Sequence, residues 1–299
     1  MRTMLGILTS SALCLCLGCS NDSAAGNGRF RLFLESEETI TEGLEPGSEL
    51  DNVQDGWTVR YDKLLYVAGD VRAHSNGSGA TSSEKTVYLL DLKQLPESGF
   101  ELLADNDAEA VRYDDVSFSN PIATSSVKSA PAVDDEDRAA MVDGGWSIYI
   151  VGQIEKSSTT VRFAWGLAAP TAYEHCGPEE GDLGFAVTRG GTTSANFTIH
   201  GDHWFFNGFP EGAEIVARQA QWVADSDLNH DGETTIDELK MTKAADVFPS
   251  SGNQKYSFAG SPEPIKTAYN FLLSQAQTIG HFQGEGECEW KSLIASTDN

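Results

Sequence analysis

Residues 227–239, DLNHDGETTIDEL, carry oxygen-bearing side chains at a spacing that could hold a calcium ion. A calcium-binding loop between two helices takes ligands from positions 1, 3, 5, 7, 9 and 12, and it needs a glycine at position 6 for the sharp turn. In the register that starts at Asp227, the ligand positions hold Asp227, Asn229, Asp231, Glu233, Thr235 and Glu238, and Gly232 stands at the turn. The spacing predicts Ca2+ as the cofactor. The alternative is an acidic turn between helices.

One position of this EF-hand-like loop departs from the usual pattern. Position 8 normally carries an aliphatic residue that pairs with a second loop, and here it is Thr234. We find no second loop of this type in the sequence, so we expect a solitary hand. The side-chain carboxylates come from Asp227, Asp231 and Glu238 only, which favours an affinity near that of extracellular modules, about 10⁻⁴ to 10⁻³ M. We therefore favour a structural clip, meaning a calcium ion that stays bound and holds the helices in place, over a calcium-dependent conformational switch.

Three histidines form a second group of candidate ligands. His200 and His203 lie in IHGDHWFF (199–206), with Asp202 between them, and His281 lies in GHF (280–282). Imidazoles suit zinc and copper. The spacing is not diagnostic, because residues i and i+3 of a continuous strand point to opposite faces. The alternative is local hydrogen bonding at a strand-to-helix junction. His230, inside the calcium loop, is expected to face solvent.

Catalytic motifs are absent from the sequence. There is no GxSxG, HExxH, phosphate-binding loop or dinucleotide-binding glycine pattern. Carboxylate pairs are frequent in a chain this acidic, and the sequence does not show whether two of them converge as a glycosidase requires. No catalytic residue is therefore assigned. A secreted hydrolase remains a third alternative, behind two metal-binding hypotheses.

The N-terminus has the composition of a bacterial export signal. After a short basic start, residues 4–17 form an uncharged apolar run, shorter than a membrane-spanning helix requires. LCLGC (15–19) resembles a lipobox, which predicts a signal peptide over 1–18 and lipidation at Cys19; the alternative is plain secretion after cleavage near Gly18. Residues 19–28 are expected to be a flexible tether. We expect a lipid-anchored protein of the bacterial cell envelope, at the outer membrane.

Charge and cysteine usage narrow the possible partners. The formal net charge of −25 disfavours nucleic acid and direct binding to anionic lipid, which leaves the lipid anchor as the membrane contact.

Outside the N-terminal segment only Cys176 and Cys288 remain, and an exported protein with two cysteines most often pairs them. The prediction is a Cys176–Cys288 disulfide. Two free thiols are the alternative.

The distribution of β-branched and aromatic residues predicts a mainly β fold. Strands are expected over 29–34, 57–71, 86–92, 146–154, 159–167, 185–187 and 195–199, and helices over 211–223, 236–247 and 262–278; Asp134 to Asp137 are expected in an exposed loop. The predicted architecture is an antiparallel β-sandwich over 29–205, a helical EF-hand subdomain over 206–291 and a tail over 292–299.

Several of these motifs together resemble a family of exported bacterial lipoproteins with one EF-hand. The resemblance rests on DGW (55–57), YDK (61–63), FAWG (163–166), IHGDH (199–203), the calcium loop, and GHF with GEG and Cys288 after it. It implies export and calcium binding, assigns no reaction, and lends support to the histidine site through its pairing of HGDH with GHF.

The sequence therefore favours a calcium-binding envelope lipoprotein that acts as a binding or scaffold module. The second hypothesis is a transition-metal (Cu/Zn) binding or carrier protein that uses His200, His203 and His281.

Overall fold

The computed structural model describes residues 26–179, 181–209, 216–252 and 255–294. Its strands are β1 (Asn27–Ser36), β2 (Thr58–His74), β3 (Thr81–Asp91), β4 (Phe100–Glu109), β5 (Arg112–Tyr113), β6 (Asp115–Asn120), β7 (Lys128–Ser129), β8 (Ile148–Lys156), β9 (Thr159–Leu167), β10 (Thr171–Glu174), β11 (Phe185–Ala186), β12 (Thr192–Ile199), β13 (Glu233–Thr234), β14 (Gly280–Phe282) and β15 (Glu289–Ser292). The helices are α1 (Glu38–Thr41), α2 (Asp135–Gly144), α3 (Gln221–Asp225), α4 (Ile236–Met241), α5 (Ala244–Val247) and α6 (Ala268–Gln275), with 3-10 turns η1 (Leu92–Gln94) and η2 (His203–Phe205).

Strand residues outweigh helical ones, 42% against 17%, which confirms the mainly β prediction. Local alternation explains why: along β9, Val161, Phe163, Trp165 and Leu167 are buried while most residues between them are not. All seven expected strands are present, and β8 and β9 form an antiparallel hairpin. Strands β4, β6 and β10 were not predicted from the sequence.

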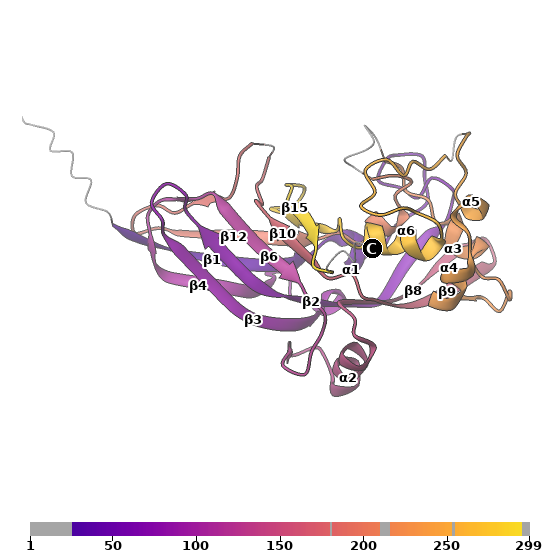
Figure 1. Cartoon of the computed structure of the whole chain (residues 1–299), viewed down its shortest axis with the longest axis horizontal. Helices are drawn as coiled ribbons and strands as arrows, with labels where there is room; N and C mark the ends of the chain where they lie inside the picture. The colour runs from indigo at the N-terminus through magenta and orange to yellow at the C-terminus, as the bar shows by residue number, and fades with distance from the viewer. Residues whose placement is uncertain (1–25, 180, 210–215, 253–254, 295–299) are drawn as a thin grey trace, which may run out of the picture.

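Two large sheets carry the fold (Figure 1). The smaller has the order β14-β12-β1-β4, and the nine-stranded sheet follows the path β13-β9-β8-β2-β6-β10-β15. Off this path, β3 pairs with β2, and β7 pairs with β3. Strands β5 and β11 form a separate pair. The pairing is mixed rather than antiparallel throughout, because β1 and β12 run parallel over eight registered pairs. The direction of strands so far apart in the chain depends on a long crossover that local patterns do not specify.

The two sheets contact each other through aromatic side chains. Phe118 of β6 packs against Phe197 of β12, with ring centroids 4.3 Å apart, and stacks on Tyr173 of β10 at 4.6 Å. Tyr173 in turn leaves no room for a side chain at position 280, since a Cβ there would lie 2.6 Å from its ring. Gly280 therefore lets β14 pack tightly and fixes where the next residue, His281, is presented.

The C-terminal helices gather at one end of the molecule, beside β8 and β9 (Figure 1). They are shorter than expected. Residues 216–220 are not helical, because Arg218 makes bridge pairs with Val53 and Phe206, and α3 starts only where the Asp55 carboxylate accepts hydrogen bonds from the amides of Ala220 and Gln221. The first part of that expected helix, 211–215, lies outside the described residues.

The other two expected helices are also shortened by local capping. Residues 236–247 form α4 and α5 with a break at Thr242, which adopts an extended conformation. Helix α6 starts at Ala268, because Thr267 and Asn270 form a reciprocal capping box that defines its N-terminus. Of the expected loop 134–137, residues 135–137 instead form the first turn of α2, and Asp134 caps this helix by accepting from the Asp137 amide at 2.8 Å.

Residues 206–291 are joined to both sheets. They supply β13 and β15 to the nine-stranded sheet and β14 to the smaller one. The sulfur atoms of Cys176 and Cys288 are bonded, which confirms the predicted pair. At the N-terminal side, β1 already begins at Asn27, so the expected tether ends before residue 28; the signal peptide and Cys19 lie outside the described residues.

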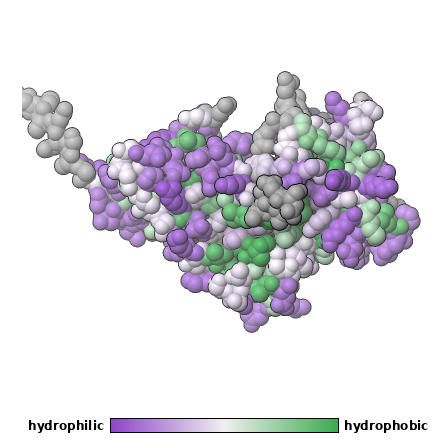
Figure 2. Space-filling view, in the orientation of Figure 1, coloured by the Kyte–Doolittle hydropathy of each residue, from purple (hydrophilic) through white to green (hydrophobic). Residues whose placement is uncertain are grey.

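The face shown in Figure 2 is largely hydrophilic over the strand-rich end, in keeping with the acidic composition. Among the helices that the structure describes, none combines the length and apolar composition needed to cross a membrane.

Candidate metal centre

A sharp change of direction after β12 brings the three histidines together. Strand β12 ends at Ile199, and the turn at Gly201 leads into η2, which starts at His203. The chain packs closely here, since a Cβ on Gly201 would lie 2.5 Å from the Ile40 side chain. Because the strand does not continue through His203, the opposite-face argument from spacing i, i+3 does not apply. Strand β14 pairs antiparallel with β12 and adds His281 opposite Thr198.

The imidazole rings lie in mutual contact. The ring centroids of His200 and His281 are 4.2 Å apart, those of His203 and His281 5.1 Å, and those of His200 and His203 5.6 Å. One nitrogen from each ring lies within 4.8 Å of the other two. Nitrogen ligands of a tetrahedral zinc ion are about 3.3 Å apart, given Zn–N bonds of about 2.0–2.1 Å. Small side-chain rotations would therefore suffice to enclose an ion.

All three histidines are buried, and their hydrogen-bond partners differ. His203 pairs through Nδ1 with the Thr278 hydroxyl at 2.8 Å, which leaves its Nε2 for a ligand. His200 has Nδ1 3.3 Å from Glu37 and Nε2 3.2 Å from the Gly284 carbonyl. His281 is 7% exposed, yet neither of its ring nitrogens has a hydrogen-bond partner among the residues that the structure describes. Buried polar atoms without partners are rare, and an ion or water is a common explanation.

The electrostatics of the centre favour neutral imidazoles. Burial lowers the pKa of His203 well below its ordinary value, and the nearby His200 and Arg218 act in the same direction. Burial, followed by His203 and His200, also lowers the pKa of His281 well below 6.5, although Asp202 and the Gly286 backbone act weakly against this. Neutral imidazole is the form that binds a metal ion. At neutral pH the centre is therefore ready for a cation without first releasing protons from these two rings.

A cavity of about 350 Å³ gives access to two of the three rings. Its lining consists of His203, Thr278, Gly280, His281, Glu287, Cys288, Glu289 and Trp290. The disulfide therefore forms part of the wall next to the candidate ligands. A metal ion held by the three histidines could keep one coordination position facing this cavity, where water or a small ligand would bind.

Asp202, which stands between the first two histidines, is not a member of this group. Its carboxylate is 1% exposed and accepts a hydrogen bond from Arg218 Nε at 2.7 Å. Two carboxylates that the sequence did not single out approach His200 instead: Glu37 and Glu285 each offer an oxygen within 4.8 Å of a His200 nitrogen and of each other. Glu285 lies four residues after His281, whereas nothing in the sequence connects Glu37 to position 200.

The predicted calcium loop folds into a tight turn between α3 and α4. Asp227 accepts hydrogen bonds from the amides of Asp231 and Gly232, at 3.2 and 2.9 Å. Asn229 and Asp231 accept in the same way from the amides two residues on. Gly232 has φ of +84°, which a glycine adopts without strain. Among the predicted ligands, Asp227, Asn229 and Asp231 therefore point into one turn.

Glu238 closes this loop from the other side. Its Oε1 accepts from the Leu228 and Asn229 amides, at 3.1 and 3.3 Å, and its Oε2 accepts from the Thr235 amide and hydroxyl. Burial raises the pKa of Glu238, but these hydrogen bonds outweigh it and leave the pKa below 4.5. Glu238 is thus a carboxylate tied to both ends of the loop. His230 is exposed, as expected.

Positions 7 and 8 of the loop pair with the large sheet. Glu233 and Thr234 form β13, which runs parallel to β9 opposite Arg162 and Phe163. Trp165 donates from Nε1 to the Thr234 carbonyl at 2.7 Å, and the Thr234 hydroxyl donates to the Val223 carbonyl at 2.8 Å. The strand β9 therefore occupies the place where paired hands have a second loop, and Thr234 uses its hydroxyl in a buried bond.

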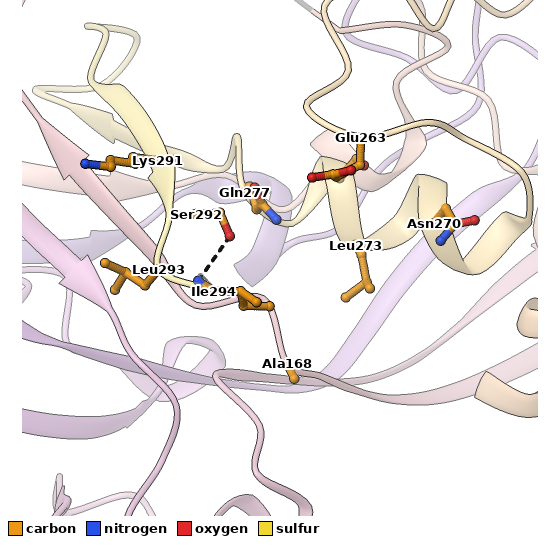
Figure 3. A pocket seen from close by; sticks show the side chains of 10 residues that line it. Ala168, Glu263, Asn270, Leu273, Gln277, Lys291, Ser292, Leu293 and Ile294 are labelled. Atoms are coloured by element: carbon orange, nitrogen blue, oxygen red, sulfur yellow. Dashed lines mark hydrogen bonds between the residues drawn. The ribbon is translucent and has the colours of Figure 1, made fainter. Parts of the chain in front are cut away.

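A larger cavity lies elsewhere, and its described lining holds no comparable set of groups. It measures about 740 Å³ and lies between α6 and β15 (Figure 3). Its charged lining residues are Glu263 and Lys291, and Figure 3 shows them on opposite sides, with Lys291 turned away. Leu273, Leu293 and Ile294 supply apolar surface. Cavity size alone therefore does not locate the chemistry of this protein.

Comparisons of the chain with models of protein families, with curated proteins and with solved structures found no match, so the resemblance to exported lipoproteins stays a prediction.

Proposed function

We propose that this protein binds a transition-metal ion through His200, His203 and His281. The observation that carries the proposal is His281, a buried imidazole beside two further buried imidazoles, whose two nitrogens have no hydrogen-bond partner within the described part of the chain. Imidazole ligands suit Zn2+, Cu2+, Fe2+ and Ni2+. Three protein ligands and an adjoining cavity leave a position for water or a small ligand, so the site fits a metal-dependent binding protein or carrier.

Titration of the protein, purified without an affinity tag, with Co2+ tests this proposal through the visible absorption of the bound ion. His281→Ala should weaken Co2+ binding by more than about 100-fold, because loss of even an outer-sphere partner of a metal ligand costs about 10–100-fold. His74→Ala is the matched control, since His74 lies outside the centre and pairs with Thr81. Equal binding by the wild-type and His281→Ala proteins would refute the proposal.

A second candidate function is calcium binding in the loop 227–238. The supporting observation is the turn in which Asp227, Asn229 and Asp231 converge while Glu238 closes it. We propose that an ion here acts as a structural clip between β9 and the α3–α4 segment, with the carbonyl of Glu233 and a water held by Thr235 completing the ligand set. On this view the segment is an EF-hand, in a helical subdomain packed on a β-sandwich.

Thermal unfolding with calcium or with EDTA distinguishes this clip from an acidic turn. At a calcium concentration of about 10–100 times the Kd, binding stabilises the folded state by roughly 1.4–2.7 kcal/mol, which corresponds to a rise of several degrees in Tm. Glu238→Gln should abolish the rise, while the helix cap survives because Gln also serves in a capping box. Glu233→Gln should retain it, since only the Glu233 carbonyl is a proposed ligand. An unchanged Tm in the wild type would exclude the clip.

We further propose that the protein is exported and anchored by lipid on Cys19. The disulfide supports export, because such bonds persist in oxidising compartments. Metabolic labelling with palmitate should mark the wild-type protein and leave Cys19→Ser unlabelled; equal labelling would contradict the assignment.

A further inference from the structure

His200 belongs to two groups of candidate ligands at once. It meets His203 and His281 on the buried side, and it meets Glu37 and Glu285 on the other, in each case with one ligand atom per residue within 4.8 Å of the rest. His200 is 3% exposed, Glu37 is half-buried and Glu285 is exposed, so the second group leads from the interior to solvent.

The fold holds both carboxylates against the end of the smaller sheet. Glu37 follows β1, whose last residue pairs with Ile199, and its amide donates to the Ile199 carbonyl at 3.3 Å. The Thr39 hydroxyl donates to Glu37 Oε2 at 2.6 Å, and that same oxygen is 3.3 Å from His200 Nδ1. The side chain of Glu37 is therefore oriented toward the imidazole before any ion arrives.

Glu285 is placed by the turn that follows β14. Gly284 has φ of +89°, and its amide donates to the Thr198 hydroxyl at 3.0 Å, while the Phe282 amide donates to the Gly286 carbonyl at 2.8 Å. These bonds tie the turn to β12 next to His200. Two carboxylates therefore face one imidazole at this position.

We propose that Glu37, His200 and Glu285 form a second cation position, so that His200 bridges two divalent ions. One imidazole can do so by using Nδ1 for one ion and Nε2 for the other, and its remaining ring proton then passes to solvent. The contact of Nε2 with the Gly284 carbonyl would be released in that step. Two carboxylate oxygens and one imidazole favour Zn2+, Fe2+ or Mn2+ over the softer ions.

This inference rests on the proposed three-histidine centre, and the number of bound ions tests the two separately. The protein is equilibrated with Zn2+ in millimolar calcium, which occupies the loop 227–238, then freed of excess metal and analysed for zinc per chain. The expected content is two Zn2+ in the wild type, one in Glu285→Gln and one in His281→Gln. Glu38→Gln, which removes a neighbouring exposed carboxylate outside both groups, should retain two.

Other outcomes decide between the alternatives. A wild type and a Glu285→Gln variant that both bind one Zn2+ would overturn the second position, as would Glu37→Gln weakening the ion at the three histidines without lowering the zinc content. The latter would make Glu37 a positioning residue that only orients His200. One Zn2+ in the wild type, none in Glu285→Gln and one in His281→Gln would uphold the carboxylate position and refute the three-histidine centre.

The bridge itself has a spectroscopic signature. Two Cu2+ ions that share an imidazolate couple magnetically, so the integrated EPR intensity of the wild type should be well below that of two isolated ions, and Glu285→Gln should show the full signal of one. An uncoupled spectrum from the two-copper protein would refute the shared role of His200.

Discussion

The surroundings of individual histidines decide what this protein can bind. Burial keeps His203 and His281 neutral, and His200 acts in the same direction on both. His281 has no hydrogen-bond partner among the described residues. Such an arrangement costs stability unless a ligand compensates for it. The same residues would therefore link the proposed metal binding to protonation and folding.

In metal-free protein, acidification should reduce stability through these histidines. The pKa of His281 lies well below 6.5 in the folded state and returns to about 6.5 on unfolding, so the unfolded chain binds more protons below that pH. The contribution of neutral His281 to the free energy of unfolding is fully present above about pH 6.5. It is lost as the pH falls toward the folded-state pKa. The free energy of unfolding should decrease by up to about 1.4 kcal/mol per pH unit for each such group.

Urea unfolding in EDTA at pH 7.5 and 5.5 measures this effect. Glu37, whose pKa is raised, contributes with the opposite sign at lower pH, so the comparison is made between variants. His281→Gln should lose part of the pH dependence, and His74→Gln should not. If the free energy of unfolding changes equally between the two pH values in wild-type and His281→Gln protein, His281 is not a buried neutral group.

Among the secondary-structure elements, the short strand β13 connects the loop 227–238 to the sheet. It is only two residues long, yet it pairs with β9 and receives a hydrogen bond from Trp165. At the start of α3 the capping group also comes from elsewhere in the chain, since it is the Asp55 carboxylate. Helices α4 and α6 are instead capped locally. The short elements β13 and α3 are therefore defined by tertiary contacts more than by their own propensity.

Thr234→Val tests whether the hydroxyl at position 8 supports this connection. Thr234 is fully buried and donates to the Val223 carbonyl, which also accepts from the Ser226 amide. Since that carbonyl keeps one partner, we expect a loss of about 1 kcal/mol in the free energy of unfolding. Thr193→Val removes a similar hydroxyl–carbonyl bond that solvent can reach. Its cost should be smaller, and equal costs in urea unfolding would contradict the proposed role of Thr234.

For the molecule as a whole, the disulfide joins the strand-rich part to the C-terminal segment. Cys176 follows β10 and Cys288 precedes β15, with 112 residues of sequence separation between them. Those residues include the loop, α3 to α6 and β14. The bond therefore restrains the segment that carries both candidate metal sites.

Replacing both cysteines by alanine should lower the free energy of unfolding by about 2–5 kcal/mol, because a loop this long gains much conformational entropy when released. Chemical denaturation of the oxidised wild type and the double variant gives the difference. Cys288 also lines the cavity beside His203 and His281, so Co2+ binding should weaken in the same variant. A loss of stability below about 1 kcal/mol would indicate that packing alone holds the segment.

Part of this organisation could be read from the sequence. The alternation of β9 gives its bounds to the residue, and the two cysteines available for pairing do pair. The helix expected over 211–223 was wrong over residues 216–220, because Arg218 takes up extended pairing with Val53 and Phe206. The parallel pairing of β1 with β12 was missed as well. Both depend on partners distant in the chain.

The sequence alone determined the kinds of ligand available: oxygen ligands at calcium-loop spacing, and His200, His203 and His281 as imidazoles. It could do so because residue identity and short spacing are local properties. Only the tertiary structure decided that the three imidazoles meet, through the turn at Gly201 and the pairing of β12 with β14. It also placed Glu37 beside His200, 163 positions further along the chain, because proximity across strands is set by sheet topology and not by sequence separation.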